Sequence, residues 1–232
     1  MYNSKYKWIR DEININDLPL TVKVFRHLSY DIVRRIRTFD GLRTTHHWFE
    51  CLEPFMTNKK KPVKILEIGS HEGQSTCWFL KHIINSNSNN KIVCCDPQYV
   101  SHWGGVAYKD IFEYNLSNHL KNSDSLELYK GLRYKYYETQ SENHRQFDII
   151  YIDGCHDYPE VSIDIKNCHN LLKKHGVIIV DDYDKTYADT KTKDPSKWCD
   201  GVKKAIDEFL NIVDSDYKIL HKKYQIIIQK LI

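Results

Sequence analysis

The chain of 232 residues has no apolar run close to the roughly 18 to 20 consecutive residues that a membrane-spanning helix needs. Its first residues, MYNSKYKWIRDEIN, also lack the apolar core of a secretory signal peptide. We therefore expect a soluble, cytoplasmic protein with no membrane partner.

The chain also lacks an excess of either charge, since 34 Lys and Arg stand against 31 Asp and Glu and the net charge is +3. So small and dispersed a charge gives no footprint for nucleic acid, and we do not expect a nucleic-acid partner. The seven cysteines are odd in number and never spaced C-x-x-C, which fits neither a disulfide framework nor a zinc site. We expect most of them to be reduced and buried.

From residue 63 onward, short apolar runs alternate with helical patterns. The runs are VKILEIG, KIVCCD, FDIIYID and GVIIVDD. Continuous apolarity predicts burial on both faces, so these are strands of a parallel sheet covered by helices. The last stretch, YKILHKKYQIIIQKLI, predicts a closing antiparallel hairpin. The fold predicted is α/β and doubly wound: a Rossmann-like, mostly parallel sheet of seven strands with that hairpin at its C-terminal end.

Two helices are supported by their apolar spacing. The stretch PEVSIDIKNCHNLLKKHG predicts a helix from about 159 to 173, with Pro159 in the first turn and Gly176 past the end. Its apolar face is formed by Val161, Ile165, Cys168 and Leu172. A second stripe, in DGVKKAIDEFL, is formed by Val202, Ile206, Phe209 and Leu210. Both stripes are expected to face the core.

Residues 1–60 differ from the rest, being aromatic and basic with helical patterns through HLSYDIVRRIRTFD and HHWFECLEPFM. We predict an N-terminal helical extension or lid over 1–60 and the main α/β domain over 61–232. The extension is expected to pack beside the sheet or to cover its active edge. It could carry substrate or subunit contacts, which leaves a homo-oligomer open.

The stretch ILEIGSHEGQST predicts a strand, a sharp turn and the start of a helix. Gly69 and Gly73 allow the backbone to approach a ligand, and Ser75 lies where free helix N–H groups favour a negative charge. The spacing G-x-x-x-G after Glu67 is neither a dinucleotide fingerprint nor a phosphate-binding loop. Asp96 ends the next strand, where an acid can hold ribose hydroxyls. A nucleotide-like ligand is implied.

In this order the residues resemble the S-adenosylmethionine (SAM) site of class I methyltransferases. The resemblance implies SAM as the cofactor, with Asp96 gripping its ribose, Ser75 touching its carboxylate and His71 flanking its methionine part. The positions it implies for cofactor binding are Glu67, Gly69, His71, Gly73, Ser75, Asp96 and Asp153.

Carboxylates follow the two later apolar runs, Asp153 after FDIIYID and the pair Asp181 and Asp182 after GVIIVDD. If these strands are neighbours, about 4.8 Å apart, the three carboxylates converge on one sheet edge beside the cofactor. Their repulsion would be relieved by a divalent cation, and an all-oxygen set suits Mg²⁺, or Mn²⁺ or Ca²⁺ by the same logic. His156, with an ordinary pKa of roughly 6.5, could take a proton from a substrate hydroxyl there.

The stretches IDGCHDYPEVSIDI, GVIIVDDYD and DGVKKAIDEFL resemble metal-dependent O-methyltransferases that act on sugars of antibiotics and glycans, the macrocin and rhamnosyl O-methyltransferase group. The similarity spans about residues 62–212 and extends more distantly to catechol O-methyltransferase. It implies that Asp153, Asp181 and Asp182 bind Mg²⁺ and that His156 is the catalytic base, with Asp153 also in the catalytic set. The implied partner is a small-molecule or glycan acceptor with a hydroxyl group.

Several alternatives stay open. The acceptor could be a catechol or phenol, or the chain could be a non-catalytic SAM-binding module. RNA methylation is disfavoured because no Lys-Asp-Lys-Glu set and no basic stripe stands out. Asp153 or Asp182 could instead cap a turn, and His156 could be structural. The polar segments at 97–110 and 182–200 are expected to shape an acceptor pocket.

Overall fold

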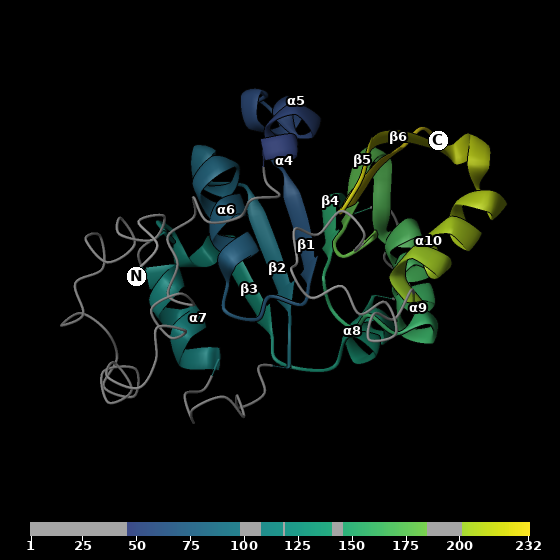
Figure 1. The fold of residues 1–232 in the computed structure, drawn as a ribbon. Coiled ribbons are helices and arrows are strands. Elements are labelled where there is room, and N and C mark those ends of the chain that lie inside the picture. Colours follow the sequence, from purple (N-terminus) through teal and green to yellow (C-terminus); the bar gives the residue numbers. More distant parts are fainter. Residues whose placement is uncertain (1–45, 98–107, 118, 141–145, 185–200) are drawn as a thin grey trace, which may run out of the picture.

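The structure is a computed structural model that describes residues 46–97, 108–117, 119–140, 146–184 and 201–232. Within these ranges seven strands form one sheet in the order β3-β2-β1-β4-β5-β7-β6 (Figure 1). The strands are β1 Lys64–Ile68, β2 Lys91–Cys95, β3 Leu126–Tyr129, β4 Phe147–Ile152, β5 Leu172–Val180, β6 Tyr217–Lys222 and β7 Ile226–Lys230. The first five run parallel, whereas β7 is antiparallel to both of its neighbours. The predicted α/β fold with its closing hairpin is confirmed.

Helices cover both faces of the sheet. They are α4 His46–Cys51, α5 Glu53–Thr57, α6 Gln74–His82, α7 Tyr108–Ser117, α8 Arg133–Thr139, α9 Tyr158–Leu171 and α10 Gly201–Ile212. Figure 1 shows α6 and α7 beside the β1–β3 half and α8, α9 and α10 beside the β4–β5 half. One buried cluster contains Trp48, Trp78 and Phe79, and a second contains Tyr137 and Ile165. No helix in the described ranges is long and apolar enough to cross a membrane.

Helix α9 ends earlier than its sequence pattern predicts. Pro159 does occupy the first turn, but the helix stops at Leu171 and Leu172 already begins β5. The cause is pairing in the sheet, because Leu172 takes an extended conformation and lies opposite Phe147 of β4. The assignment of Gly176 to the position past the helix end is therefore wrong, since this glycine lies inside β5.

The first described residues confirm one of the two N-terminal helical patterns. The stretch HHWFECLEPFM forms α4 and α5, and Trp48 and Leu52 are fully buried against α6 and the sheet. The pattern HLSYDIVRRIRTFD lies outside the described residues, as do 98–107 and 185–200, most of the two predicted acceptor segments. The domain division at residue 60 stays a prediction.

Candidate active site

The loop after β1 is built on two glycines in the left-handed region, Gly69 at φ 85° and Gly73 at φ 82°. A Cβ atom at Gly69 would lie 2.1 Å from the carbonyl oxygen of Asp153, so the loop passes directly against the end of β4. Only glycine fits such a close approach at this dihedral angle. The structure thus brings the glycine loop and Asp153 together at the carboxyl edge of the sheet.

Asp96 closes the same loop from the end of β2. Its Oδ2 accepts the backbone N–H of Ser70 at 2.9 Å and that of His71 at 2.8 Å. These two bonds hold the turn in which His71 takes the left-handed φ of 48°. The structure therefore places Asp96 and His71 next to each other, while their roles toward ribose and methionine stay predictions.

Glu67 lies underneath the loop and is completely buried. It accepts hydrogen bonds from the hydroxyl of Ser75, from the hydroxyl of Thr76 at 2.5 Å and from the thiol of Cys94 at 3.2 Å. Burial raises the pKa of Glu67 to about 7. These hydrogen bonds hold the first turn of α6 against β1, so Glu67 and Ser75 support the loop that joins the two elements. Their contacts with the cofactor stay predictions.

Asp153 and Asp181 follow β4 and β5, and the predicted adjacency of these two strands is confirmed. Their ladder pairs Ile152 with Val180 as its last residues. The N–H of Asp181 donates to the carbonyl of Ile152 at 3.0 Å, so the parallel pairing continues one step into the carboxylates. Asp182 comes next, at φ 54°.

Each of the three carboxylates accepts a hydrogen bond from the side chain of a tyrosine or a glutamine. Tyr151 donates to Asp153 Oδ2 at 3.0 Å, Gln225 donates to Asp181 Oδ1 at 2.6 Å, and Tyr224 donates to Asp182 Oδ1.

Sequence reasoning missed these three donors. A signal was present for two of them, because a hairpin strand antiparallel to β5 returns its turn to the carboxyl edge. The register that pairs Val180 with Ile226 places Gln225 beside Asp181.

His156 joins this group from the loop after β4. Its Nε2 lies 3.2 Å from Asp182 Oδ2 and 3.8 Å from Asp153 Oδ1, and its side chain is 38% exposed. The loop is held from behind by α10, since a Cβ at Gly201 would stand 2.4 Å from the carbonyl oxygen of His156. The two carboxylates order the imidazole and bury its Nε2 atom, so a proton can be exchanged with a substrate only through the exposed part of the ring.

The electrostatics of the carboxylates favour a cation. Burial raises the pKa of Asp181 to about 8, with further contributions from the charges of Asp153 and Asp182. Burial also raises the pKa of Asp153, and Asp182 adds to the effect. In the described part of the chain no three His, Cys, Asp or Glu side chains are already grouped as a metal centre. Carboxylate oxygens are nevertheless the ligand type that hard divalent ions prefer.

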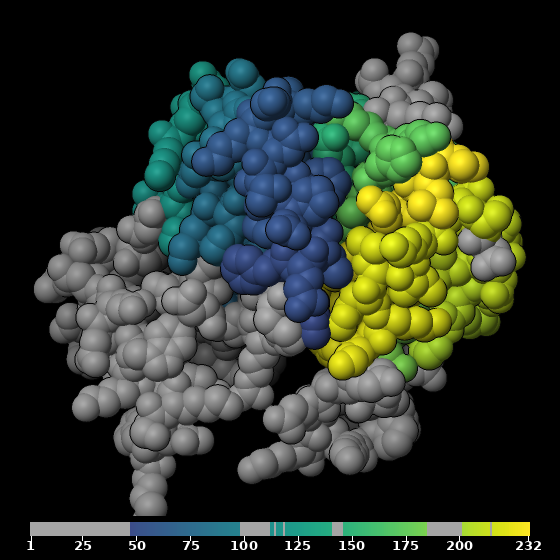
Figure 2. All heavy atoms as spheres, turned by 90° about the horizontal axis from the view of Figure 1, so that it is seen from above, coloured from purple at the N-terminus to yellow at the C-terminus, as the bar shows by residue number. Residues whose placement is uncertain are grey.

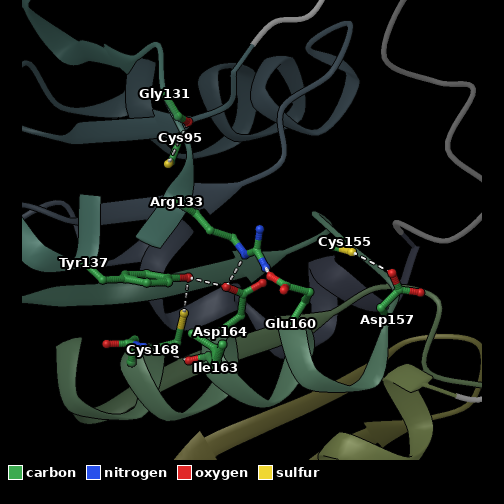
Figure 3. Close-up of polar contacts among 11 residues, drawn as sticks. Cys95, Gly131, Arg133, Tyr137, Cys155, Asp157, Glu160, Ile163, Asp164 and Cys168 are labelled. Carbon is green, nitrogen blue, oxygen red and sulfur yellow. Dashed lines mark hydrogen bonds and ion pairs between the residues drawn. The ribbon is translucent and has the colours of Figure 1, made fainter. Parts of the chain in front are cut away.

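A second buried polar cluster joins α8 to α9 near the same edge, and Figure 3 shows it in close-up. Arg133, in the first turn of α8, donates from Nε to Asp164 at 2.5 Å and pairs through Nη2 with Glu160. Tyr137 donates to the same Asp164 oxygen at 3.0 Å. Burial raises the pKa of Asp164 to about 6. No sequence pattern predicted this cluster, because its members are scattered and match no motif.

Comparison with known proteins gives a family match. A family model described as "Methyltransferase domain" matches residues 66–183, just over half of the chain. No curated protein matches the chain.

Solved structures supply the fold. The O-methyltransferase from Bacillus cereus, in complex with SAH (S-adenosylhomocysteine), has 19% identity, covers 97% of this chain and 96% of its own, and gives a TM-score of 0.56. TomG from Streptomyces achromogenes, bound to SAM and involved in tomaymycin synthesis, has 14% identity. The match covers 99% of this chain and 97% of TomG, with a TM-score of 0.52. MycE of the mycinamycin pathway, bound to Mg and SAH, has 15% identity. The match covers 92% of this chain and 55% of MycE, with a TM-score of 0.54.

Proposed function

Because the chain belongs to the methyltransferase-domain family, whose model matches residues 66–183, we propose that it transfers the methyl group of SAM to a hydroxyl group of a sugar. The acceptor would be a deoxysugar of a small molecule or a glycan, and Mg²⁺ would assist the reaction. The observation that carries the proposal is the position of His156, 3.2 Å from Asp182 and 3.8 Å from Asp153 at the edge where the glycine loop lies.

The glycine loop and the start of α6 are the proposed SAM site. Gly69 and Gly73 give the loop the left-handed turns that shape this edge, and the N–H groups of the first helical turn suit the carboxylate of the cofactor. Asp96, at the end of β2, would accept hydrogen bonds from the ribose hydroxyls. Glu67 would keep this surface in place through its bonds to Ser75 and Thr76.

The chemical step moves a methyl group from a sulfonium to oxygen. The acceptor oxygen attacks the methyl carbon, the carbon–sulfur bond breaks, its electron pair stays on sulfur, and SAH leaves as a neutral thioether. His156 takes the proton of the acceptor hydroxyl at Nδ1, while its Nε2–H faces Asp153 and Asp182, which stabilise the imidazolium that results. Holding the hydroxyl in line with the methyl group supplies much of the rate enhancement.

Asp153, Asp181 and Asp182 are the residues that would hold Mg²⁺. A bound divalent ion would stabilise the negative charge that develops on the acceptor oxygen. The raised pKa values of Asp153 and Asp181 support this role, since a cation would remove the repulsion that contributes to them. MycE, a protein with a similar fold, was solved with Mg and SAH.

A sugar acceptor with two neighbouring hydroxyls could bind the ion through both oxygens, and so could a catechol. An acceptor screen separates the two. Purified protein, SAM and Mg²⁺ are incubated with deoxysugar glycosides, glycans, catechols and phenols, and SAH is quantified.

Turnover of sugars that is lost with EDTA and with His156→Ala supports the full proposal. Turnover of catechols alone would show that the acceptor is a catechol and not a sugar. SAM binding without turnover of any acceptor would favour a non-catalytic module.

A further inference from the structure

We propose that Trp48 of α4 is a positioning residue for the carboxylate site and acts on Asp181 through Gln225. The inference deepens the proposed function and rests on it, because it assigns to the first described helix a part in holding the Mg²⁺ site. No motif points to Trp48, and residues 1–60 carried no assigned role beyond a cover or contact surface.

The three residues form a continuous hydrogen-bonded chain. The indole N–H of Trp48 donates to Gln225 Oε1 at 2.8 Å, and Gln225 Nε2 donates to Asp181 Oδ1 at 2.6 Å. Trp48 is fully buried and Gln225 is nearly so. The first bond links residues 177 positions apart in the sequence. Figure 2 shows the early and late segments, purple-blue and yellow, meeting at the surface.

The orientation of the Gln225 amide between its two partners follows from their hydrogen-bonding chemistry. A glutamine amide can present either its oxygen or its nitrogen to a neighbour, and a carboxylate accepts only the nitrogen's hydrogens. An indole N–H is a donor only, so Trp48 requires the oxygen of Gln225 on its side. That leaves Nε2 facing Asp181. Without the indole, a flipped amide would direct its oxygen at a carboxylate, which is repulsive, and would leave the Asp181 orientation undefined.

The ring of Trp48 also packs against Tyr151, which is the hydrogen-bond donor to a second carboxylate. It packs edge-on against Tyr151 with centroids 5.2 Å apart and stacks on Phe79 at 5.0 Å. Tyr151 donates its hydroxyl to Asp153 Oδ2 at 3.0 Å. One buried side chain on α4 therefore touches the supporting partners of both Asp153 and Asp181, which lie side by side at the ends of β4 and β5.

Supporting partners of this kind affect metal affinity. Removing a group that orients a metal ligand commonly weakens the metal site by about 10- to 100-fold while the ligands themselves stay in place. Trp48→Phe keeps an aromatic ring in the cluster and deletes the N–H together with part of the indole ring, so its effect on the hydrogen bond is separated from lost packing by a control. Gln225→Met removes the link between indole and carboxylate at similar volume.

Trp78→Phe is the matched control. Trp78 is buried in the same cluster, edge-on to Trp48 at 4.9 Å, and lies outside the hydrogen-bonded chain. Both Trp-to-Phe changes remove the same atoms from one core, so a general loss of packing affects both variants alike.

The first experiment measures Mg²⁺ binding by calorimetry with SAH present. We expect the Mg²⁺ dissociation constant to rise about 10- to 100-fold for Trp48→Phe and for Gln225→Met. The double variant should bind Mg²⁺ no more weakly than Gln225→Met alone, since Trp48 acts on Asp181 through Gln225. SAH affinity should stay within threefold. Equal Mg²⁺ affinity in Trp48→Phe and Trp78→Phe would overturn the inference.

The second experiment needs no metal. The side-chain amide resonances of Gln225 are recorded by NMR in the wild type and in the variants. We expect a shift of these signals in Trp48→Phe and in Asp181→Asn, and little change in Trp78→Phe. If the wild type binds no Mg²⁺, the metal part of the proposed function fails, and these amide signals still decide the inference. Unshifted signals in Trp48→Phe would refute it.

Discussion

Asp153 and Asp181 stand side by side at the ends of β4 and β5, one residue beyond the last ladder pair of Ile152 and Val180. The spacing of parallel strands sets their backbones about 4.8 Å apart, which is close enough for two carboxylates to share one ligand and too close for two buried charges without one. This relationship underlies the proposed role of Asp181 as a metal ligand.

Asp181→Ala should abolish Mg²⁺-dependent turnover and leave SAM affinity within several-fold, because Asp181 is a proposed metal ligand and not part of the glycine loop. Turnover is measured across a Mg²⁺ titration, and SAM binding by calorimetry. Asp148→Ala is the control, since Asp148 lies at the opposite end of β4, paired with Lys173 at 2.8 Å. Unchanged turnover in Asp181→Ala would defeat the metal assignment.

His156→Ala should lower kcat by about 10²- to 10⁴-fold, the usual contribution of a general base. KM for SAM should change little, because His156 lies beside the carboxylates and not in the glycine loop. His169→Gln serves as control, being a histidine of α9 bonded to Tyr217 at 3.0 Å. A fall in kcat of less than threefold for His156→Ala would return this residue to a structural role.

The sequence predicted the elements that a local pattern determines. Buried apolar runs gave the parallel strands, and the acid that ends each run identified Asp96, Asp153 and Asp181 at one sheet edge. Of the strand order, only the adjacency of β4 and β5 was predicted. The predicted end of α9 was wrong because Leu172 pairs with Phe147 in the sheet. This pairing joins residues distant in sequence, and no helical pattern reveals it.

The residues that support the site could not be predicted in the same way. Arg133 and Asp164 meet only because α8 packs on α9, and Trp48 meets Gln225 only after the last hairpin has joined the sheet. Such partners depend on tertiary packing and carry no spacing of their own. The predicted contacts of Glu67 and Ser75 with a ligand stay predictions, and the hydrogen bond between these two residues was not foreseen.

Gly69→Ala should weaken SAM binding by at least tenfold and reduce the free energy of unfolding by more than about 2 kcal/mol, because a left-handed φ and a backbone collision combine. The new Cβ would lie 2.1 Å from the Asp153 carbonyl. Gly154→Ala is the control, since its Cβ would come no closer than 3.3 Å to another atom, Cγ2 of Ile68, and no closer than 3.9 Å to the backbone. Urea unfolding and calorimetry measure both effects; equal losses in the two variants would contradict the close-approach argument.

Arg133→Met should destabilise the fold by about 3 to 5 kcal/mol, since it leaves the carboxylate of Asp164 buried without its cation. Restoring neutrality with Asp164→Asn in the same chain should recover part of the loss. Lys135→Met removes an exposed pair with Glu138 and should have no measurable effect. Chemical denaturation of the four proteins checks this, and a similar stability of Arg133→Met and Lys135→Met would refute the role of the buried pair.

Glu67→Gln should change how stability depends on pH. Burial raises the pKa of Glu67 from 4.5 to about 7 in the folded state, so between these pH values the native state binds more protons than the unfolded chain. The contribution of Glu67 to the free energy of unfolding therefore falls as pH rises through that window.

Glutamine keeps an acceptor for Ser75 or Thr76 and does not titrate. The unfolding free energy of Glu67→Gln relative to the wild type should consequently increase from about pH 4.5 to 7, by up to about 1.4 kcal/mol per pH unit, and level off above. Urea unfolding at half-unit intervals measures the difference, with the exposed Glu138→Gln as control. A difference that stays constant across the window would mean that Glu67 keeps an ordinary pKa beneath the loop.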